Sequence, residues 1–353
     1  MTDQPDVARV LVTSVGSLVG RGVLDVLVGR RQRLHLVGGD ADPVSPAFAE
    51  CDEWVHLPAS TDADFVPAVE EACRRFGVDL VIPGRDPDVL ALSVANDDPA
   101  SPVTGPIAPA ALVTATRDKW ETAHLCARLG VPFAPTVCTD EPRAAEHAAE
   151  LVHEWGFPLI AKPRRGSGSL GVRVLLDHGH LDACLALADY IVQPFLDPPS
   201  AASLAIEASK GVPLFWEVPV IDTPAVMAVI EPDGGVRGPV CCAVTQRLGR
   251  VEDVRLVTDE SMIEFATTAV HRFRDAGWRG PLNLPLRAGP TGWYVIEINP
   301  RFTGSTSSRL HLGFDEVGIT INAWTGRTIV APVAAPPVSR VRRILHDFPI
   351  RPA

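Results

Sequence analysis

Three polar side chains near the carboxyl end of the chain, Glu297, Asn299 and Arg301, follow an apolar run at alternating positions. The alternation predicts a strand over residues 293–299 that places these side chains on one face. Carboxylate and amide oxygens are suitable ligands for Mg²⁺ or Mn²⁺, and an arginine suits a phosphate. The pattern therefore predicts a metal and phosphate site, although a solvated strand edge closed by a Pro-Arg turn would look the same.

Lysine is rare in this chain, because only three of the 32 basic residues are lysines: Lys119, Lys162 and Lys210. A lysine retained among so many arginines indicates a position that needs a compact ammonium group, as a phosphate site does. Lys162 ends an apolar strand-like run and is followed by a turn rich in glycine, serine and arginine at residues 164–169. Such a hairpin could cover a polyphosphate with backbone N–H groups, or it could be a flexible surface hairpin.

A second glycine turn lies near the amino terminus, with Gly16, Gly20 and Gly22 after a buried-type strand at residues 8–13. With Asp40 at the end of the next strand, it could bind a dinucleotide such as NAD. The tyrosine and lysine pair of short-chain dehydrogenases is absent, because the residues four positions after the two tyrosines are Pro194 and Ile298. The turn thus predicts a Rossmann-like fold more strongly than an NAD-linked enzyme.

The elements that must position these residues alternate between strands and helices over the first hundred residues, which predicts an open parallel sheet. A turn-rich break at residues 97–106 follows. Beyond it we expect a strand at 133–137, the hairpin around Lys162, antiparallel strands within 202–245, and an amphipathic helix at 259–276. A strand at 280–287 should pair with the strand at 293–299, and the proline-rich end should be a loosely attached tail.

Composition limits the classes of function. The chain has 353 residues and a formal charge of −11, which indicates two or three globular domains and disfavours nucleic-acid binding. The chain lacks an apolar run long enough for a membrane span and a basic amino-terminal region typical of a signal peptide, so we expect a cytoplasmic protein. Seven scattered cysteines without a CxxC pair indicate reduced thiols.

The order of these features resembles the ATP-grasp superfamily, particularly the branch similar to the large subunit of carbamoyl phosphate synthetase. The resemblance spans roughly residues 8–326 and is most specific at 157–163 with 166–171, and at 297–301 with Gly304 and Ser305. It implies an α/β protein with an ATP-grasp fold, in which two α+β subdomains clasp ATP, preceded by a Rossmann-like parallel-sheet domain. The expected divisions are 1–105 for this pre-ATP-grasp domain, 106–190 and 191–330 for the two subdomains, and 331–353 for the tail.

The resemblance also implies roles for individual residues. Contacts to ATP are expected from two lysines, a mobile glycine-serine lid and a hinge that reads adenine: Lys119, Lys162, Gly166, Ser167, Gly168, Ser169, Val192, Gln193 and Phe195. Metal ligands and a phosphate contact are expected near the carboxyl end: Glu297, Asn299 and Arg301.

Two positions depart from the family pattern. Pro285 stands where an acidic residue or glutamine usually supplies the first metal ligand, and proline has no side-chain oxygen. Asn283, two residues earlier on the same strand face, could replace it. The glutamate expected to hold the ribose is also missing after the hinge, where Asp197 is the nearest candidate.

The reaction that the resemblance implies is ligation of a small-molecule carboxylate to a small-molecule amine, with substrates of the amino-acid or peptide type, through an acyl phosphate. It uses ATP and Mg²⁺ (or Mn²⁺) and releases ADP and phosphate, with neither nucleic acid nor membrane as partner. Arg309 and Arg247 are candidates for holding the substrate carboxylate or the γ-phosphate, and His311 is a weaker candidate for a general base. An ATP-binding protein that has lost catalysis is an alternative because of Pro285 and the missing ribose glutamate, and the NAD-linked enzyme is a third. The sequence leaves a homodimer open.

Overall fold

The computed structural model describes residues 7–166, 170–196, 222–247, 250–333 and 338–344. The amino-terminal part is a four-stranded parallel sheet in the order β3-β2-β1-β4, as the alternating pattern predicted. Its strands are β1 (Ala8–Val12), β2 (Leu34–Asp40), β3 (Glu53–His56) and β4 (Leu80–Ile82), and its helices are α1 (Leu18–Leu27), α2 (Phe65–Phe76) and α3 (Asp86–Asp97), with a short 3₁₀ turn η1 (Pro46–Glu50). Because the strands are parallel, the turns that follow β1, β2 and β4 lie along one edge of the sheet.

Helices α4 (Ala110–Thr116) and α5 (Lys119–Leu129) lead from this sheet to a small antiparallel sheet in the order β5-β8-β6-β7. Its elements are β5 (Val137–Cys138), α6 (Ala144–Trp155), β6 (Leu159–Pro163), β7 (Arg173–Leu175), α7 (His178–Leu185) and β8 (Tyr190–Pro194). The strand predicted at 133–137 is shorter than expected. Of that run only Val137 lies in β5, while Phe133 forms an isolated bridge with Val295.

The carboxyl-terminal part is a six-stranded antiparallel sheet in the order β13-β12-β9-β10-β11-β14. Its elements are β9 (Thr223–Ile230), β10 (Val236–Arg247), β11 (Arg250–Leu256), α9 (Glu260–Asp275), β12 (Gly280–Gly289), β13 (Gly292–Val295), α10 (Thr306–His311), α11 (Glu316–Thr325) and β14 (Arg340–Arg342). The apolar residues whose spacing predicted α9 form its buried face: Met262, Ala266, Ala269, Val270 and Phe273.

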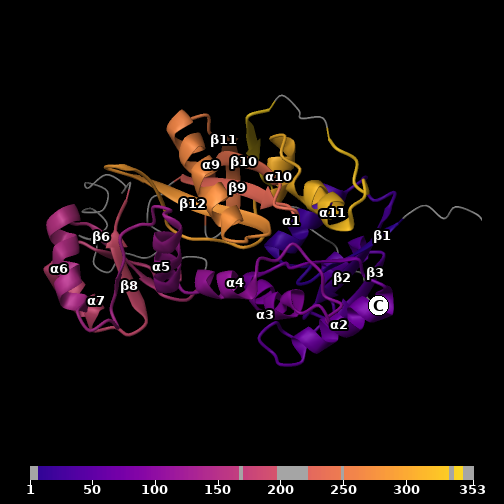
Figure 1. Ribbon diagram of the computed structural model, residues 1–353, viewed down its shortest axis with the longest axis horizontal. Coiled ribbons are helices and arrows are strands. Elements are labelled where there is room, and N and C mark those ends of the chain that lie inside the picture. The colour runs from indigo at the N-terminus through magenta and orange to yellow at the C-terminus, as the bar shows by residue number, and fades with distance from the viewer. Residues whose placement is uncertain (1–6, 167–169, 197–221, 248–249, 334–337, 345–353) are drawn as a thin grey trace, which may run out of the picture.

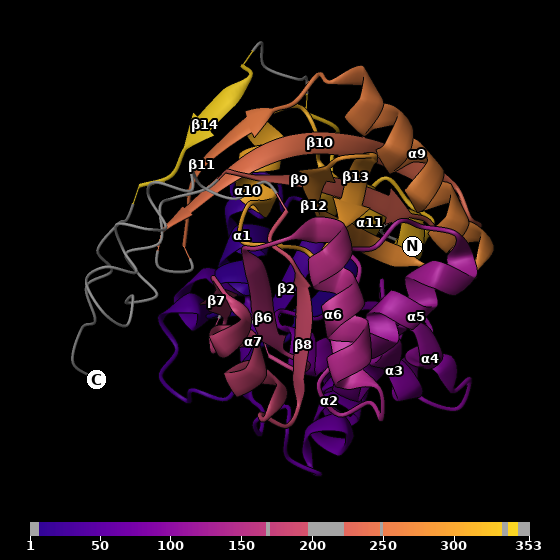
Figure 2. The ribbon, with the colours of Figure 1, turned by 90° about the vertical axis from the view of Figure 1, so that its left-hand side faces the viewer.

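Two segments differ from expectation. Strand β13 ends at Val295, because beyond it the chain keeps only single contacts with β12, such as the bridge between Asn283 and Asn299. The segment expected to be a loose tail contributes β14, which pairs with β11 at the sheet edge (Figure 2). Prolines near residue 335 obscured this strand, which depends on pairing with a distant segment.

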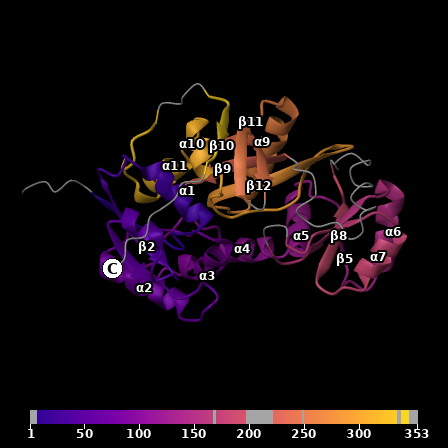
Figure 3. The same cartoon turned by 180° about the vertical axis from the view of Figure 1, so that it is seen from behind.

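The small sheet and the amino-terminal sheet lie at opposite ends of the molecule, with the large sheet spanning the region between them (Figures 1 and 3). The large sheet shares a buried cluster with the amino-terminal sheet, in which Val10 and Val12 of β1 join Met227 and Val229 of β9. This packing joins the parallel sheet to the large sheet. Within the described part of the chain, no helix is long and apolar enough to cross a membrane.

Candidate functional site

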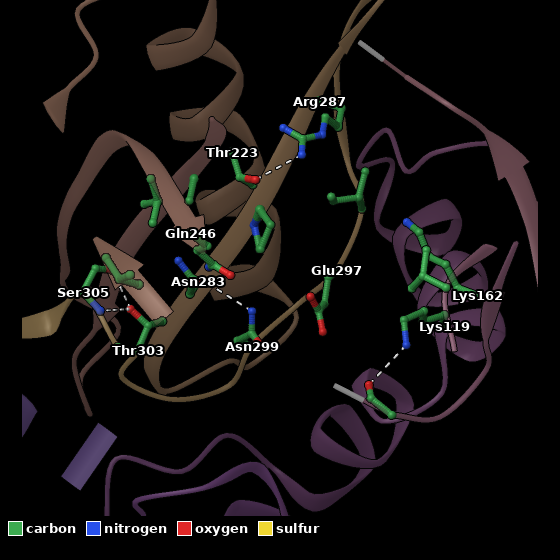
Figure 4. Close-up of a pocket in the computed structure, with 18 of the residues that line it drawn as sticks. Lys119, Lys162, Thr223, Gln246, Asn283, Arg287, Glu297, Asn299, Thr303 and Ser305 are labelled. Carbon is green, nitrogen blue, oxygen red and sulfur yellow. Dashed lines mark hydrogen bonds between the residues drawn. The ribbon is translucent and has the colours of Figure 1, made fainter. Parts of the chain in front are cut away.

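A cavity of about 420 Å³ lies between the small sheet and the large sheet (Figure 4). Its walls include the start of α5, strands β6 and β8, strand β12, and the segment after β13. Nine of the residues singled out from the sequence line it: Lys119, Lys162, Gly166, Gln193, Phe195, Asn283, Glu297, Asn299 and Arg301. The tertiary structure therefore gathers residues that are up to 182 positions apart, from Lys119 to Arg301, into one site.

Lys119 is the first residue of α5, and two neighbours fix its position. Asp118 caps the helix by accepting a hydrogen bond from the Trp120 amide at 3.0 Å, and it pairs with Arg164 at 2.8 Å. This pair holds the start of α5 against the turn after β6. The Lys119 Nζ atom consequently donates to the carbonyl oxygens of Pro163 at 3.2 Å and Gly166 at 3.3 Å.

Lys162 projects from β6 and donates through Nζ to Gln193 Oε1 on β8 at 2.9 Å. Gln193 is itself held, because its Nε2 donates to Thr136 Oγ1 at 2.9 Å. Burial lowers the pKa of Lys162 to about 8, with Glu297 opposing that shift and Lys119 adding to it. Burial also lowers the pKa of Lys119. Two close, partly desolvated ammonium groups would be stabilised by an anion, so this wall of the cavity suits a phosphate.

Glu297 lies between these lysines and the Asn299 side of the cavity (Figure 4). It is the only acidic residue among the described residues that line the cavity, and the described chain holds no cluster of three or more His, Cys, Asp or Glu residues suited to a metal. Mg²⁺ often binds proteins through one or two carboxylates and completes its shell with substrate phosphates and water. The donor set fits a metal bound mainly through the nucleotide.

Asn283 is less suited to bind a metal than the sequence suggested. Its Nδ2 donates to the Val226 carbonyl at 2.9 Å, its Oδ1 accepts from Asn299 Nδ2 at 3.1 Å, and the residue is 5% exposed. These bonds give Asn283 the role of orienting Asn299. Pro285 occupies the next position on the same face of β12 and lines the cavity without a ligand atom.

Arg301 lines the cavity and is anchored from the amino-terminal sheet. Its Nη2 atom lies 2.6 Å from Asp86 Oδ2 at the start of α3, and it also donates to Asn299 Oδ1 at 3.2 Å. Its Nε atom is buried and has no hydrogen-bond partner among the described residues. An unpaired buried donor is costly, and an anion in the cavity could satisfy it.

Arg309 does not have the substrate-binding position expected of it. The side chain is 1% exposed and lies outside the described cavity lining, with Nε 2.5 Å from Glu316 Oε2. It also donates to Thr303 Oγ1 at 2.8 Å and to Ser305 Oγ at 2.5 Å, and these two residues do line the cavity. Arg309 therefore supports the loop that forms one wall. His311 is exposed and likewise lies outside the described lining.

Replacing Arg309 with methionine should lower the free energy of unfolding by about 3–5 kcal/mol, because it leaves Glu316 buried without its partner. Chemical denaturation measures this loss. The double variant Arg309→Met with Glu316→Leu should recover part of it, since the unpaired charge is removed as well. If the variant kept its stability but lost catalysis, Arg309 would instead be a substrate-binding residue.

Other predicted residues are placed as follows. Val192 is buried in the core of the small sheet and lies outside the described lining. Arg247 ends β10. Ser167, Gly168, Ser169 and Asp197 lie outside the described residues.

Sequence reasoning missed Arg287, which lines the cavity from β12 and donates to the Asp222 carbonyl at 2.8 Å and to Thr223 Oγ1 at 3.0 Å. Its position two residues after Pro285, on the same strand face, was the available signal.

The amino-terminal glycine turn does not have the features of a dinucleotide site. Asp40, expected to hold a ribose, accepts a hydrogen bond from the Gly16 amide at 2.7 Å. A side chain at Gly16 would collide with Ser45 Oγ and with Asp40. The Gly16 amide already donates to the Asp40 carboxylate, so a pyrophosphate bound at this turn would be repelled by that negative charge. The structure thus gives the NAD-linked reading no support.

Comparisons with known proteins agree with this geometry. Residues 116–305 match the family model described as ATP-grasp domain, and residues 10–102 match the model described as PylC-like, N-terminal domain. The large chains of carbamoyl phosphate synthase from Streptomyces coelicolor and Streptomyces avermitilis are 26% and 28% identical over 75% of this chain. The chain spans about a quarter of the length of these curated relatives, 23% in both cases.

Solved structures show the same fold. The N5-carboxyaminoimidazole synthetase of Staphylococcus aureus complexed with ADP has a TM-score of 0.68 at 12% identity, covering 97% of this chain and 82% of that one. The biotin carboxylase domain of 2-oxoglutarate carboxylase from Hydrogenobacter thermophilus, complexed with MgADP and bicarbonate, has a TM-score of 0.66 at 15% identity, covering 94% and 71%. From the matching family model, the shared fold and the cavity that joins both lysines to Glu297, it follows that this chain belongs to the ATP-grasp family.

Proposed function

We propose that the protein is an ATP-dependent ligase that joins a carboxylate to an amine through an acyl-phosphate intermediate. The observation that carries the proposal is the single cavity in which Lys119, Lys162, Glu297, Asn299 and Arg301 meet. Relatives and structural neighbours named as carbamoyl phosphate synthase, N5-carboxyaminoimidazole synthetase and biotin carboxylase support the same class of reaction.

In the proposed reaction, a carboxylate oxygen of the first substrate attacks the γ-phosphorus of ATP and ADP leaves. The amine nitrogen of the second substrate then attacks the acyl carbon, orthophosphate leaves, and the amine proton passes to solvent. Such phosphoryl transfer depends on positioning and charge neutralisation and needs no nucleophilic side chain.

The residues that line the cavity would have different roles in this reaction. Lys119 and Lys162 would neutralise phosphate oxygens, and the unpaired Nε of Arg301 would donate to the transferring group. Gln193, near the end of β8, and Phe195, just after that strand, would contact the adenine. Glu297 and Asn299 would hold Mg²⁺ or Mn²⁺, which would supply charge neutralisation at the β- and γ-phosphates.

A screen of carboxylates with amines, read by phosphate release and by product mass, tests the proposal. Release of phosphate with formation of an amide is expected for at least one pair. Tight ATP binding with no product from any pair would favour the second candidate, an ATP-binding protein without catalysis, for which Pro285 and the hydrogen-bonded Asn283 are the supporting observations.

Affinity for ATP should depend on pH through Lys162. Because the pKa of Lys162 is about 8 in the free protein, the lysine is protonated and attracts phosphate below that pH. Above it the group loses its charge, so the Kd for ATP should rise as the pH increases past about 8. Calorimetry in EDTA, without metal, measures this profile.

Glu297→Gln provides the control for this pH profile. Glu297 raises the pKa of Lys162, so removing its charge should move the midpoint of the profile to lower pH. A flat profile up to pH 10 would show that Lys162 does not contact the nucleotide.

A further inference from the structure

A carboxylate of the amino-terminal sheet reaches an arginine in the cavity between the small and large sheets. Asp86 is the first residue of α3, shortly after β4, and it is 8% exposed. Its Oδ2 atom lies 2.6 Å from Nη2 of Arg301, which lines the cavity. Its Oδ1 atom lies 3.8 Å from Nη1 of Arg117, two residues before Lys119. One carboxylate therefore contacts elements from opposite walls of the cavity.

The position of Asp86 is fixed by close packing of the segment after β4. The carbonyl oxygen of Gly84 accepts a hydrogen bond from Ser17 Oγ at 2.8 Å. A Cβ atom on Gly84 would lie 2.2 Å from the carbonyl oxygen of Thr13, so the backbone segments after β1 and β4 are in direct contact. On the other side of Asp86, Asp88 accepts a hydrogen bond from Thr13 Oγ1 at 2.7 Å. The start of α3 is thus held on both sides of the Asp86 carboxylate.

The remaining contacts of Arg301 show which part of its guanidinium group is left for a ligand. Nη2 also donates to Asn299 Oδ1 at 3.2 Å, and Nη1 donates to the Phe302 carbonyl oxygen at 2.9 Å. Of these three contacts, the one to Asp86 is the shortest and the only one to a charged group. The Nε atom is buried and has no hydrogen-bond partner among the described residues. Because a guanidinium group is planar and rigid, contacts that hold its Nη atoms also set the direction of its Nε–H bond.

Asp86 also supplies the counter-charge of Arg301. It is the one acid with which Arg301 forms an ion pair in the described part of the chain. The described lining of the cavity contains five basic residues and one acidic residue: Lys119, Lys162, Arg287, Arg301, Arg343 and Glu297. Before a nucleotide binds, the other four basic residues repel Arg301, and the attraction of Asp86 opposes that repulsion. Asp86 thus keeps the guanidinium group in place while the cavity is empty.

We propose that Asp86 is a positioning residue for phosphoryl transfer, which holds Arg301 with its Nε–H directed at the transferring γ-phosphoryl group of ATP. This inference rests on the proposed function, because it assigns Arg301 to that group. A donor that is already oriented needs no rearrangement as charge develops on the phosphoryl group. Loss of Asp86 should consequently affect recognition of the γ-phosphoryl group more than recognition of the rest of the nucleotide.

The test compares two nucleotides that differ at the γ-position. Calorimetric titration of the full chain with Mg²⁺ gives the Kd for AMP-PNP, which carries a γ-phosphoryl group, and the Kd for ADP, which lacks it. Asp86→Asn keeps the size of the side chain and removes its charge. It should raise the Kd for AMP-PNP about tenfold and change the Kd for ADP by less than about twofold, because only the γ-contact is impaired.

A double-mutant cycle shows whether Asp86 acts through Arg301. Arg301→Met should weaken AMP-PNP binding by about tenfold or more, again with little change for ADP. The double variant Asp86→Asn with Arg301→Met should bind AMP-PNP no more weakly than Arg301→Met alone, because the group that Asp86 positions has already been removed. Asp86→Glu keeps the charge and should bind AMP-PNP more tightly than Asp86→Asn does.

Two further variants control for net charge and for the second contact of Asp86. Glu71→Gln removes a negative charge from α2, where the side chain is 72% exposed. Arg117→Ala removes the arginine that lies 3.8 Å from Asp86. Both variants should keep the ratio of the two Kd values. An effect of Arg117→Ala equal to that of Asp86→Asn would show that Asp86 acts through the start of α5, and would overturn the inference.

The inference is also overturned if Asp86→Asn weakens AMP-PNP and ADP equally, or if the effects of Asp86→Asn and Arg301→Met are additive. The Kd for ADP reports for each variant whether the rest of the nucleotide site is intact. None of these titrations requires turnover. If the screen of carboxylates with amines gives no product, the proposed function fails, while the comparison of AMP-PNP with ADP still decides the role of Asp86.

Discussion

Replacing Lys162 with alanine should weaken ATP binding by about 100-fold, which corresponds to the loss of a strong charge-assisted hydrogen bond. Lys162 is half-buried within the cavity, and its Nζ is held 2.9 Å from Gln193 Oε1. The variant also leaves the buried Gln193 oxygen without its donor. Calorimetric titration with ATP measures the loss directly.

Two controls separate charge from packing. Lys162→Met keeps the length of the side chain and removes the ammonium, so it should lose as much affinity as Lys162→Ala. Arg173→Ala removes a positive charge from the neighbouring strand β7, where the side chain is exposed and lies outside the described cavity lining, and it should leave affinity unchanged. Equal effects of Arg173→Ala and Lys162→Ala would indicate only a general loss of positive charge.

The second large effect is expected for Glu297→Gln, which should lower kcat by about 100- to 1000-fold. Glu297 is the only acid among the described lining residues, Pro285 has no side-chain oxygen, and Asn283 is committed to Val226 and Asn299. We therefore expect this one carboxylate to supply most of the protein's share of metal binding. Steady-state phosphate release at increasing Mg²⁺ should show a much weaker dependence on the metal.

Binding in EDTA distinguishes a metal ligand from a structural residue. Without metal, Glu297→Gln should bind ATP at least as tightly as the unmodified protein at pH 7, because a negative charge beside the phosphates has been removed. Glu264→Gln, on the exposed face of α9, is the matched control and should change neither quantity. A full metal response in Glu297→Gln would mean that the metal is bound elsewhere.

Elements with a regular pattern of apolar residues could be predicted from the sequence alone. The parallel sheet follows from alternating buried strands and helices, and α9 follows from apolar residues at helical spacing. Several residues of the cavity between the small and large sheets could also be predicted, because rare lysines and the Glu-x-Asn-x-Arg pattern are local features. The cavity brings Lys119, Lys162 and Glu297 together as that reading required.

The tertiary structure alone decided which polar residues face the cavity and which are already paired. Arg309 and Arg301 look alike in sequence. Arg309 is buried in an ion pair with Glu316. Arg301 instead pairs with Asp86, more than 200 positions away, and its Nε has no hydrogen-bond partner among the described residues. The same holds for Arg343, which lines the cavity because β14 pairs with β11. Partners this distant along the chain are brought together by strand pairing and core packing, so local residue patterns do not predict them.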